Sequence, residues 1–187
     1  ITLEAHPNGK PGRQIAVVAA ERCASCGICA GSCPSATPFR SARELVTGID
    51  MPQQPIGALR ERLELALAGA GQGSVVVFGC DHGADLRQID DQRVAQFSLP
   101  CIGLLPPSFV EYALRNGASG VVVVGCAQGG CAFRLGERWT AERLAGTREP
   151  QLRASVPRER LRMIYAGLGQ EWRVAVAVEE LRDVRAT

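Results

Sequence analysis

The stretch Gly120-Val121-Val122-Val123-Val124-Gly125-Cys126 indicates the fold class of this sequence. A continuous run of β-branched residues, without polar residues in alternation, is typical of a strand that is buried on both faces of a parallel sheet. Three more short β-rich segments share this character, at 75–78, 94–99 and 161–165. Strands that alternate with helical segments predict an α/β fold, with a small open parallel sheet of about four strands of the Rossmann or flavodoxin-like kind.

Helical patterns lie between these strands. Residues 56–68 carry apolar side chains at helical spacing, with Pro55 suited to the first turn and Gly69 to the C-terminal cap. A second helix is predicted over 108–116, where Ser108 and Glu111 form a capping-box pattern and Asn116-Gly117 ends the helix. Two further helices are predicted over 136–144 and 170–184.

Cysteines follow three successive predicted strands. Cys80 follows the first, Cys101 follows the second after Pro100, Cys126 follows the third, and Cys131 comes five residues later. In an open parallel sheet the carboxyl ends of the strands meet at one edge, where ligands bind. We therefore expect the four thiols to converge into a metal site, with glycines allowing close approach and helix N-terminal amides donating to thiolates. A role as small core residues explains a single such cysteine better than it explains four.

The other four cysteines stand close together in the sequence. The run Cys23-Ala-Ser-Cys26-Gly-Ile-Cys29-Ala-Gly-Ser-Cys33-Pro34 has the ligand spacing of a bacterial-type [4Fe–4S] cluster. A predicted strand at 14–20 leads into this run, and residues 41–46 suit one or two helical turns. A module of this size is too small to fold without its metal, so we expect the cluster to be its core.

The role of Cys33 has three alternatives, because in two-cluster ferredoxins the fourth cysteine of such a run ligates the other cluster and this chain has one run. Cys33 could close the same cluster, a ligand could come from outside this chain, or a [3Fe–4S] cluster could leave Cys33 free. Four cysteines for each of two clusters is the simplest assignment, and we adopt it.

The irregular stretch 47–55 divides the chain. We expect a ferredoxin-like [4Fe–4S] module over 1–50, a linker and connecting helix over 51–73, and an α/β domain with the second cluster over 74–187. The start at Ile1, without methionine, indicates a piece excised from a longer polypeptide.

Composition excludes several classes of protein. A net charge of +2 and a pI near 8.2 argue against nucleic-acid binding. The longest apolar runs are far shorter than the roughly 20 residues of a membrane span, so we expect no membrane insertion by this chain. Eight cysteines without an export signal favour metal ligation over disulfides. They also favour a cytoplasmic location. Attachment to a membrane complex, through partners or through missing sequence, is left open.

Several motifs also resemble a known family: Phe78-Gly79-Cys80, Leu99-Pro100-Cys101 and Gly125-Cys126-Ala127-Gln128-Gly129-Gly130-Cys131. Over roughly residues 74–185 the chain resembles the iron–sulfur delta subunit that links methyl-viologen-reducing hydrogenase to heterodisulfide reductase. The resemblance implies a [2Fe–2S] cluster on Cys80, Cys101, Cys126 and Cys131. It also implies partners of the hydrogenase or dehydrogenase kind, a flavin-containing heterodisulfide reductase-like subunit, or a membrane cytochrome. Relatives occur fused to ferredoxin-like modules, which Ala19–Pro34 resembles.

One loop departs from the family pattern. Members often carry a Cys-x-x-Cys-like arrangement after the first strand, whereas this loop reads Cys80-Asp81-His82-Gly83 and has a single thiol. The ligand set carried over from the family therefore contains no spare cysteine. His82 is expected at the surface or beside the ligands, and the alternative is a Rieske-like ligand that would raise the potential.

These observations predict an electron-transfer protein or domain that relays single electrons between the two clusters and on to a larger oxidoreductase complex, with no catalytic site of its own. A zinc-stabilised or redox-sensing interaction module is one alternative, although the second group lacks paired Cys-x-x-Cys knuckles. A nucleotide- or flavin-binding enzyme subunit is another, although the sequence has no GxGxxG or Walker pattern.

Overall fold

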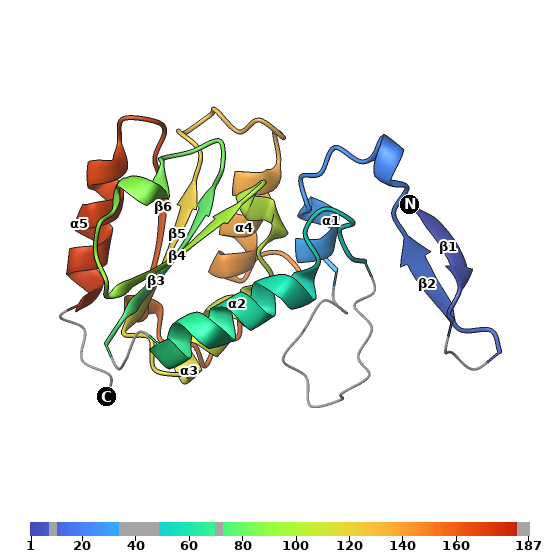
Figure 1. Cartoon of the computed structure of the whole chain (residues 1–187), viewed down its shortest axis with the longest axis horizontal. Helices are drawn as coiled ribbons and strands as arrows, with labels where there is room; N and C mark the ends of the chain where they lie inside the picture. Colours follow the sequence, from blue (N-terminus) through green and yellow to red (C-terminus); the bar gives the residue numbers. More distant parts are fainter. Residues whose placement is uncertain (8–10, 34–48, 70–72, 183–187) are drawn as a thin grey trace.

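The chain forms an α/β unit with a small N-terminal module beside it (Figure 1). The computed structural model describes residues 1–7, 11–33, 49–69 and 73–182. The α/β unit is built on a four-stranded sheet in which every strand pair is parallel, in the order β4-β3-β5-β6. All four predicted strands are confirmed: β3 Val75–Cys80, β4 Val94–Leu99, β5 Gly120–Gly125 and β6 Leu161–Tyr165.

The strand order creates a switch point between β3 and β5. From β3 the chain crosses to β4 on one side, and then returns past β3 to place β5 on its other side. The connections that follow β3 and β5 leave the carboxyl ends of these neighbouring strands in opposite directions. Ligands in open α/β sheets bind in the crevice between two connections that diverge in this way. In the register, Gly79 of β3 pairs with Val124 of β5, so the ends of these two strands are level.

Helices cover both faces of the sheet. Helices α2 Ile56–Gly69 and α3 Pro107–Arg115 pack on one face, together with α4 Gly136–Ala145, and α5 Glu171–Arg182 packs on the other. Alternate residues of β3 enter the two cores, since Val76 and Phe78 belong to one and Val75 and Val77 to the other. Both faces of the strand are therefore buried, which explains the unbroken apolar runs.

The start of α2 agrees with the sequence prediction, but the start of α3 does not. Asp50 Oδ1 accepts a hydrogen bond from the Ile56 amide at 2.8 Å, at the beginning of α2. The capping-box prediction for Ser108 is wrong, because α3 already begins at Pro107 with Pro106 in the N-cap position. Proline suits the first helical position, so Ser108 lies inside the first turn. Glu111 instead accepts a hydrogen bond from the Arg153 amide at 3.1 Å.

The N-terminal module contains a hairpin and one helical turn. Strand β2 Gln14–Val17, predicted as part of 14–20, pairs antiparallel with β1 Thr2–Ala5, which the sequence analysis did not predict. Helix α1 Ile28–Gly31 lies within the cysteine run and carries Cys29. The helical turns predicted at 41–46 lie outside the described residues. Across the ranges that the structure describes, none of the helices is long and apolar enough to cross a membrane.

Candidate metal centre

Cys80 and Cys126 meet at the switch point of the sheet. Cys80 is the last residue of β3, Cys126 follows the last residue of β5, and both are buried. Their Sγ atoms are 3.4 Å apart. A disulfide would need about 2.05 Å, whereas two thiolates on one tetrahedral metal, each with a metal–sulfur bond of about 2.3 Å, lie roughly 3.8 Å apart. The spacing is close to that of two sulfurs sharing a metal.

Cys101 reaches the same point from the neighbouring strand. It begins a single 3₁₀ turn, η3 Ile102–Leu104, and its Sγ accepts a hydrogen bond from the Gly103 amide at 3.4 Å. Its side chain is buried and interacts with the Cys80 thiol. Gly136, the first residue of α4, leaves room for this sulfur, since a Cβ there would come within 2.2 Å of Cys101 Sγ.

Cys131 is the fourth cysteine of the group and lies on its more exposed side. The chain between Cys126 and Cys131 makes a tight turn, in which the Gly130 amide donates to the Ala127 carbonyl at 2.7 Å and Gly129 has a φ of +76°. Cys131 is partly buried and acts electrostatically on both Cys101 and Cys126. The structure thus places Cys80, Cys101 and Cys126 together at the carboxyl edge of the sheet, with Cys131 close enough to act on two of them, and their role as metal ligands stays a prediction.

The thiols of this group differ in acidity. The pKa of Cys80 is lowered, mainly by a hydrogen bond with the Cys101 thiol and further by the amides of His82 and Ile102. The pKa of Cys101 is raised, first by its hydrogen bond with the Cys80 thiol and then by burial. The pKa of Cys126 is raised, first by burial and then by the neighbouring Cys80. Ionisation of one thiol is thus favoured, whereas ionisation of the others is made unfavourable, because like charges repel one another in a desolvated site. A cationic centre is needed for all of them to ionise together.

Within the described part of the chain, no group of three or more His, Cys, Asp or Glu side chains is arranged to hold a single metal ion. The close pair at the switch point is therefore the part of the group with the spacing of ligands to one metal atom.

Three cysteines of the first group also face one another. Burial is the main cause of the raised pKa of Cys29, and the charges of Cys26 and Cys23 add to it. The Ser25 amide donates to Cys23 Sγ at 3.3 Å. Ser25 and Gly27 both have positive φ, of 57° and 71°, which turns the loop back on itself. The place of Cys33 in the ligand set stays a prediction.

The two cysteine groups lie close to each other across η3. Helix α1 packs directly on η3 because two glycines allow it: a Cβ on Gly27 would come within 2.5 Å of the Leu104 side chain, and one on Gly31 within 2.2 Å of the Gly103 carbonyl oxygen. Cys23 and Cys29 pack against the apolar core that contains Cys80 and Cys126. The structure thus brings the two groups, distant in sequence, to either side of one turn.

Two charged or polar residues near the second group were not identified from the sequence. Glu137 of α4 is partly buried, its pKa is raised by burial, and the charge of Cys80 acts on it. Tyr165, at the end of β6, has a pKa raised by burial and by Glu137. His82, by contrast, is exposed with its ring edge-on to Phe133 at 5.5 Å, and its backbone amide interacts with Cys80.

A cavity of about 260 Å³ lies elsewhere, between the end of α3 and residues 153–157. These segments precede or connect the amino ends of β5 and β6. The cavity is therefore at the edge of the sheet opposite the cysteines.

Comparison with known proteins supports the resemblance seen in the sequence. Residues 75–186 match the family model described as methyl-viologen-reducing hydrogenase, delta subunit. A curated relative from Archaeoglobus profundus, an iron–sulfur subunit of an F420-non-reducing hydrogenase, is 39% identical over 56 residues. This match covers 30% of the present chain and 41% of the relative, so the chain spans less than half of the relative's length. With more than half of its residues matched to the family model, the chain belongs to the delta subunit family of methyl-viologen-reducing hydrogenase.

Proposed function

We propose that this chain is an electron-transfer subunit or domain that relays single electrons between two iron–sulfur clusters. Cys23, Cys26, Cys29 and Cys33 would hold a [4Fe–4S] cluster, and Cys80, Cys101, Cys126 and Cys131 a [2Fe–2S] cluster. The observation that carries the proposal is the pair of buried sulfurs of Cys80 and Cys126, 3.4 Å apart at the switch point of the sheet. The iron–sulfur subunit among the curated relatives supports it.

A binuclear cluster suits the second group for three reasons. Its four ligands are shared by two irons, so close pairs of thiols are required rather than one set around a single ion. When bound, a [2Fe–2S] cluster accepts and returns one electron. The burial of Cys80, Cys101 and Cys126 excludes water from the centre, and backbone amides such as that of Gly103 donate to the sulfurs. Such donors stabilise added negative charge and tune the potential.

The packing of α1 on η3 supports a relay between the groups. Cys29 lies on α1, and Cys101 begins η3, so the two proposed ligand sets are joined through directly packed protein. An electron crossing from one group to the other would pass through this contact without a change in the fold. The cysteines of the first group are partly exposed, which suits an entry or exit port for electrons.

The partners proposed for this relay are redox subunits of a hydrogenase-type complex. They include a hydrogenase or dehydrogenase, a flavin-containing heterodisulfide reductase-like subunit, or a membrane cytochrome, and the proposed location is the cytoplasm. The cavity described above gives no support to an enzymatic nucleotide site at the strand ends, because it lies at the opposite edge of the sheet.

Metal analysis of protein purified without oxygen tests the proposal. We expect a brown protein that absorbs at roughly 400 nm, as thiolate-ligated clusters do. We also expect about six irons and six acid-labile sulfides per chain, four from one cluster and two from the other. A colourless protein with stoichiometric zinc would instead identify a zinc-stabilised module and remove the electron-transfer proposal.

A further inference from the structure

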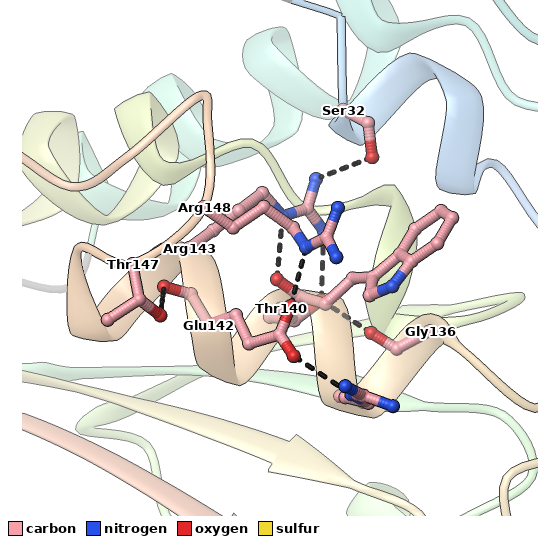
Figure 2. Close-up of polar contacts among 9 residues, drawn as sticks. Ser32, Gly136, Thr140, Glu142, Arg143, Thr147 and Arg148 are labelled. Carbon is pink, nitrogen blue, oxygen red and sulfur yellow. Dashed lines mark hydrogen bonds and ion pairs between the residues drawn. The ribbon is translucent and has the colours of Figure 1, made fainter.

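Arg143 of α4 is a fully buried arginine at the junction of the two cysteine groups (Figure 2). Its guanidinium donates to the Gly103 carbonyl and to Thr140 Oγ1, both at 2.9 Å, and to the Trp139 carbonyl at 3.2 Å. A fourth hydrogen bond, at 3.4 Å, reaches Ser32 Oγ in the N-terminal module. The side chain is therefore held in one position by neutral acceptors from both parts of the molecule.

The charge of Arg143 has no carboxylate partner among the described residues. Two neighbouring arginines show the contrast, since Arg138 and Arg148 both form ion pairs with Glu142, at 2.8 and 2.5 Å. Burial is the main cause that lowers the pKa of Arg143, to about 10, with Arg148 adding to it, so the guanidinium stays protonated at neutral pH. A buried charge without an opposite charge is unfavourable, and its retention calls for a compensating anion.

Two of the acceptors of Arg143 stand close to cysteines in the sequence. The Gly103 carbonyl that Arg143 binds lies two residues after Cys101, and Ser32 directly precedes Cys33. The charge of Cys101 acts favourably on Arg143. Four thiolates with two irons and two sulfides carry a net negative charge, which increases by one when an electron is added. A fixed positive charge beside them favours the reduced state, and the buried position screens this effect only weakly.

We propose that Arg143 is the counter-charge of the second cluster: it raises the reduction potential at Cys80, Cys101, Cys126 and Cys131, while its bond to Ser32 holds the first module against this site. This inference rests on the proposed function, since it requires a [2Fe–2S] cluster at these four cysteines. Arg143 acts as a positioning residue through its charge and is not itself a ligand.

The first test removes or keeps the charge. In an anaerobic titration, dithionite supplies one electron to the second cluster through viologen mediators, and EPR follows the reduced cluster in the full chain. For Arg143→Gln we expect the equilibrium constant of this reduction to fall at least tenfold, which corresponds to about 59 mV. Arg143→Lys keeps the charge and should change the equilibrium constant less than about threefold. Arg138→Gln is the matched control on the same helix, because the Arg138 side chain is 70% exposed. This control should also change the equilibrium constant less than about threefold.

A second pair of variants leaves Arg143 in place. Ser32→Asp puts a carboxylate beside the guanidinium and neutralises its charge, whereas Ser32→Asn offers a neutral side chain of similar size. We expect the potential of the second cluster to fall in Ser32→Asp and to stay near that of the wild type in Ser32→Asn. This pair decides the question even if Arg143→Gln does not fold or does not take up its cluster.

The outcomes separate this inference from the proposed function. A wild-type chain without a [2Fe–2S] signal would overturn the proposed function itself. A loaded wild type with an unchanged potential in Arg143→Gln, or with equal shifts in Arg143→Gln and Arg143→Lys, would overturn only the role of Arg143. Equal potentials in Ser32→Asp and Ser32→Asn would overturn that role as well.

Discussion

The two cysteine groups are held in place by different kinds of structure. In the second group, three buried cysteines follow strands of a sheet whose two faces are covered by helices, so the backbone fixes their position before any metal binds. In the first group, the cysteines stand on a loop and a single turn of helix, and all four are partly exposed. A helix of one turn is not stable by itself. The second site is therefore built by the fold, whereas we expect the first to need a bound metal to complete its local structure.

Iron removal should have the largest effect on this difference. In apoprotein prepared with a chelator and reductant, we expect residues 20–33 to lose nearly all amide-exchange protection, because we propose that the cluster is the core of that module. The strands β3 and β5 should keep their protection, since their cores are made of apolar side chains. Hydrogen exchange measured residue by residue checks this. Equal loss of protection in both regions would show that the two sites depend on metal alike.

The space around Cys101 gives the second prediction. Gly136→Ala places a Cβ within 2.2 Å of Cys101 Sγ, so we expect the second cluster to be lost from most molecules while the first is retained. Iron and sulfide content, with EPR for each cluster, measures this. The control is Gly57→Ala in α2, where a Cβ meets nothing within 4 Å. This control should keep both clusters and stabilise the chain by roughly 0.5–1 kcal/mol, as expected for glycine in a helix.

The contact between the two regions gives the smallest of the three effects. Gly31→Ala would bring a Cβ within 2.2 Å of the Gly103 carbonyl oxygen, and backbone has little freedom to yield. Overpacking of this kind typically destabilises by about 1–3 kcal/mol. We expect both clusters to bind, and the exchange protection of α1 to fall while that of the sheet is unchanged. Unaltered protection of α1 would mean that the module does not depend on its packing against η3.

The sequence predicted the parts of the molecule that follow from periodicity and chain direction. Runs such as Val121–Val124 identified strands buried on both faces, and parallel strands must end at one edge, so the meeting of Cys80, Cys101 and Cys126 could be expected. The start of α3 was misjudged, because the Pro106-Pro107 pair outweighs the capping-box pattern at Ser108.

Residues that matter through tertiary contacts could not be predicted. Arg143 lies in a stretch rich in Arg and Glu that resembles an exposed helix face, and only the packing of α4 against η3 and Ser32 buries it. Gly136 resembles an ordinary helix start until the neighbouring sulfur of Cys101 is known. Strand β1 is short and exposed along its whole length, so its sequence carries no pattern of burial.

We propose that the strand-end cysteines hold a [2Fe–2S] cluster separate from the cluster at Cys23–Cys33. EPR of the dithionite-reduced wild type and of Cys126→Ser tests it most directly, because reduced [4Fe–4S] clusters relax quickly and give signals only at low temperature, whereas reduced [2Fe–2S] clusters remain visible on warming. We predict that Cys126→Ser abolishes or strongly alters the signal that persists on warming and leaves the low-temperature signal intact. Survival of both signals unchanged in Cys126→Ser would contradict the assignment.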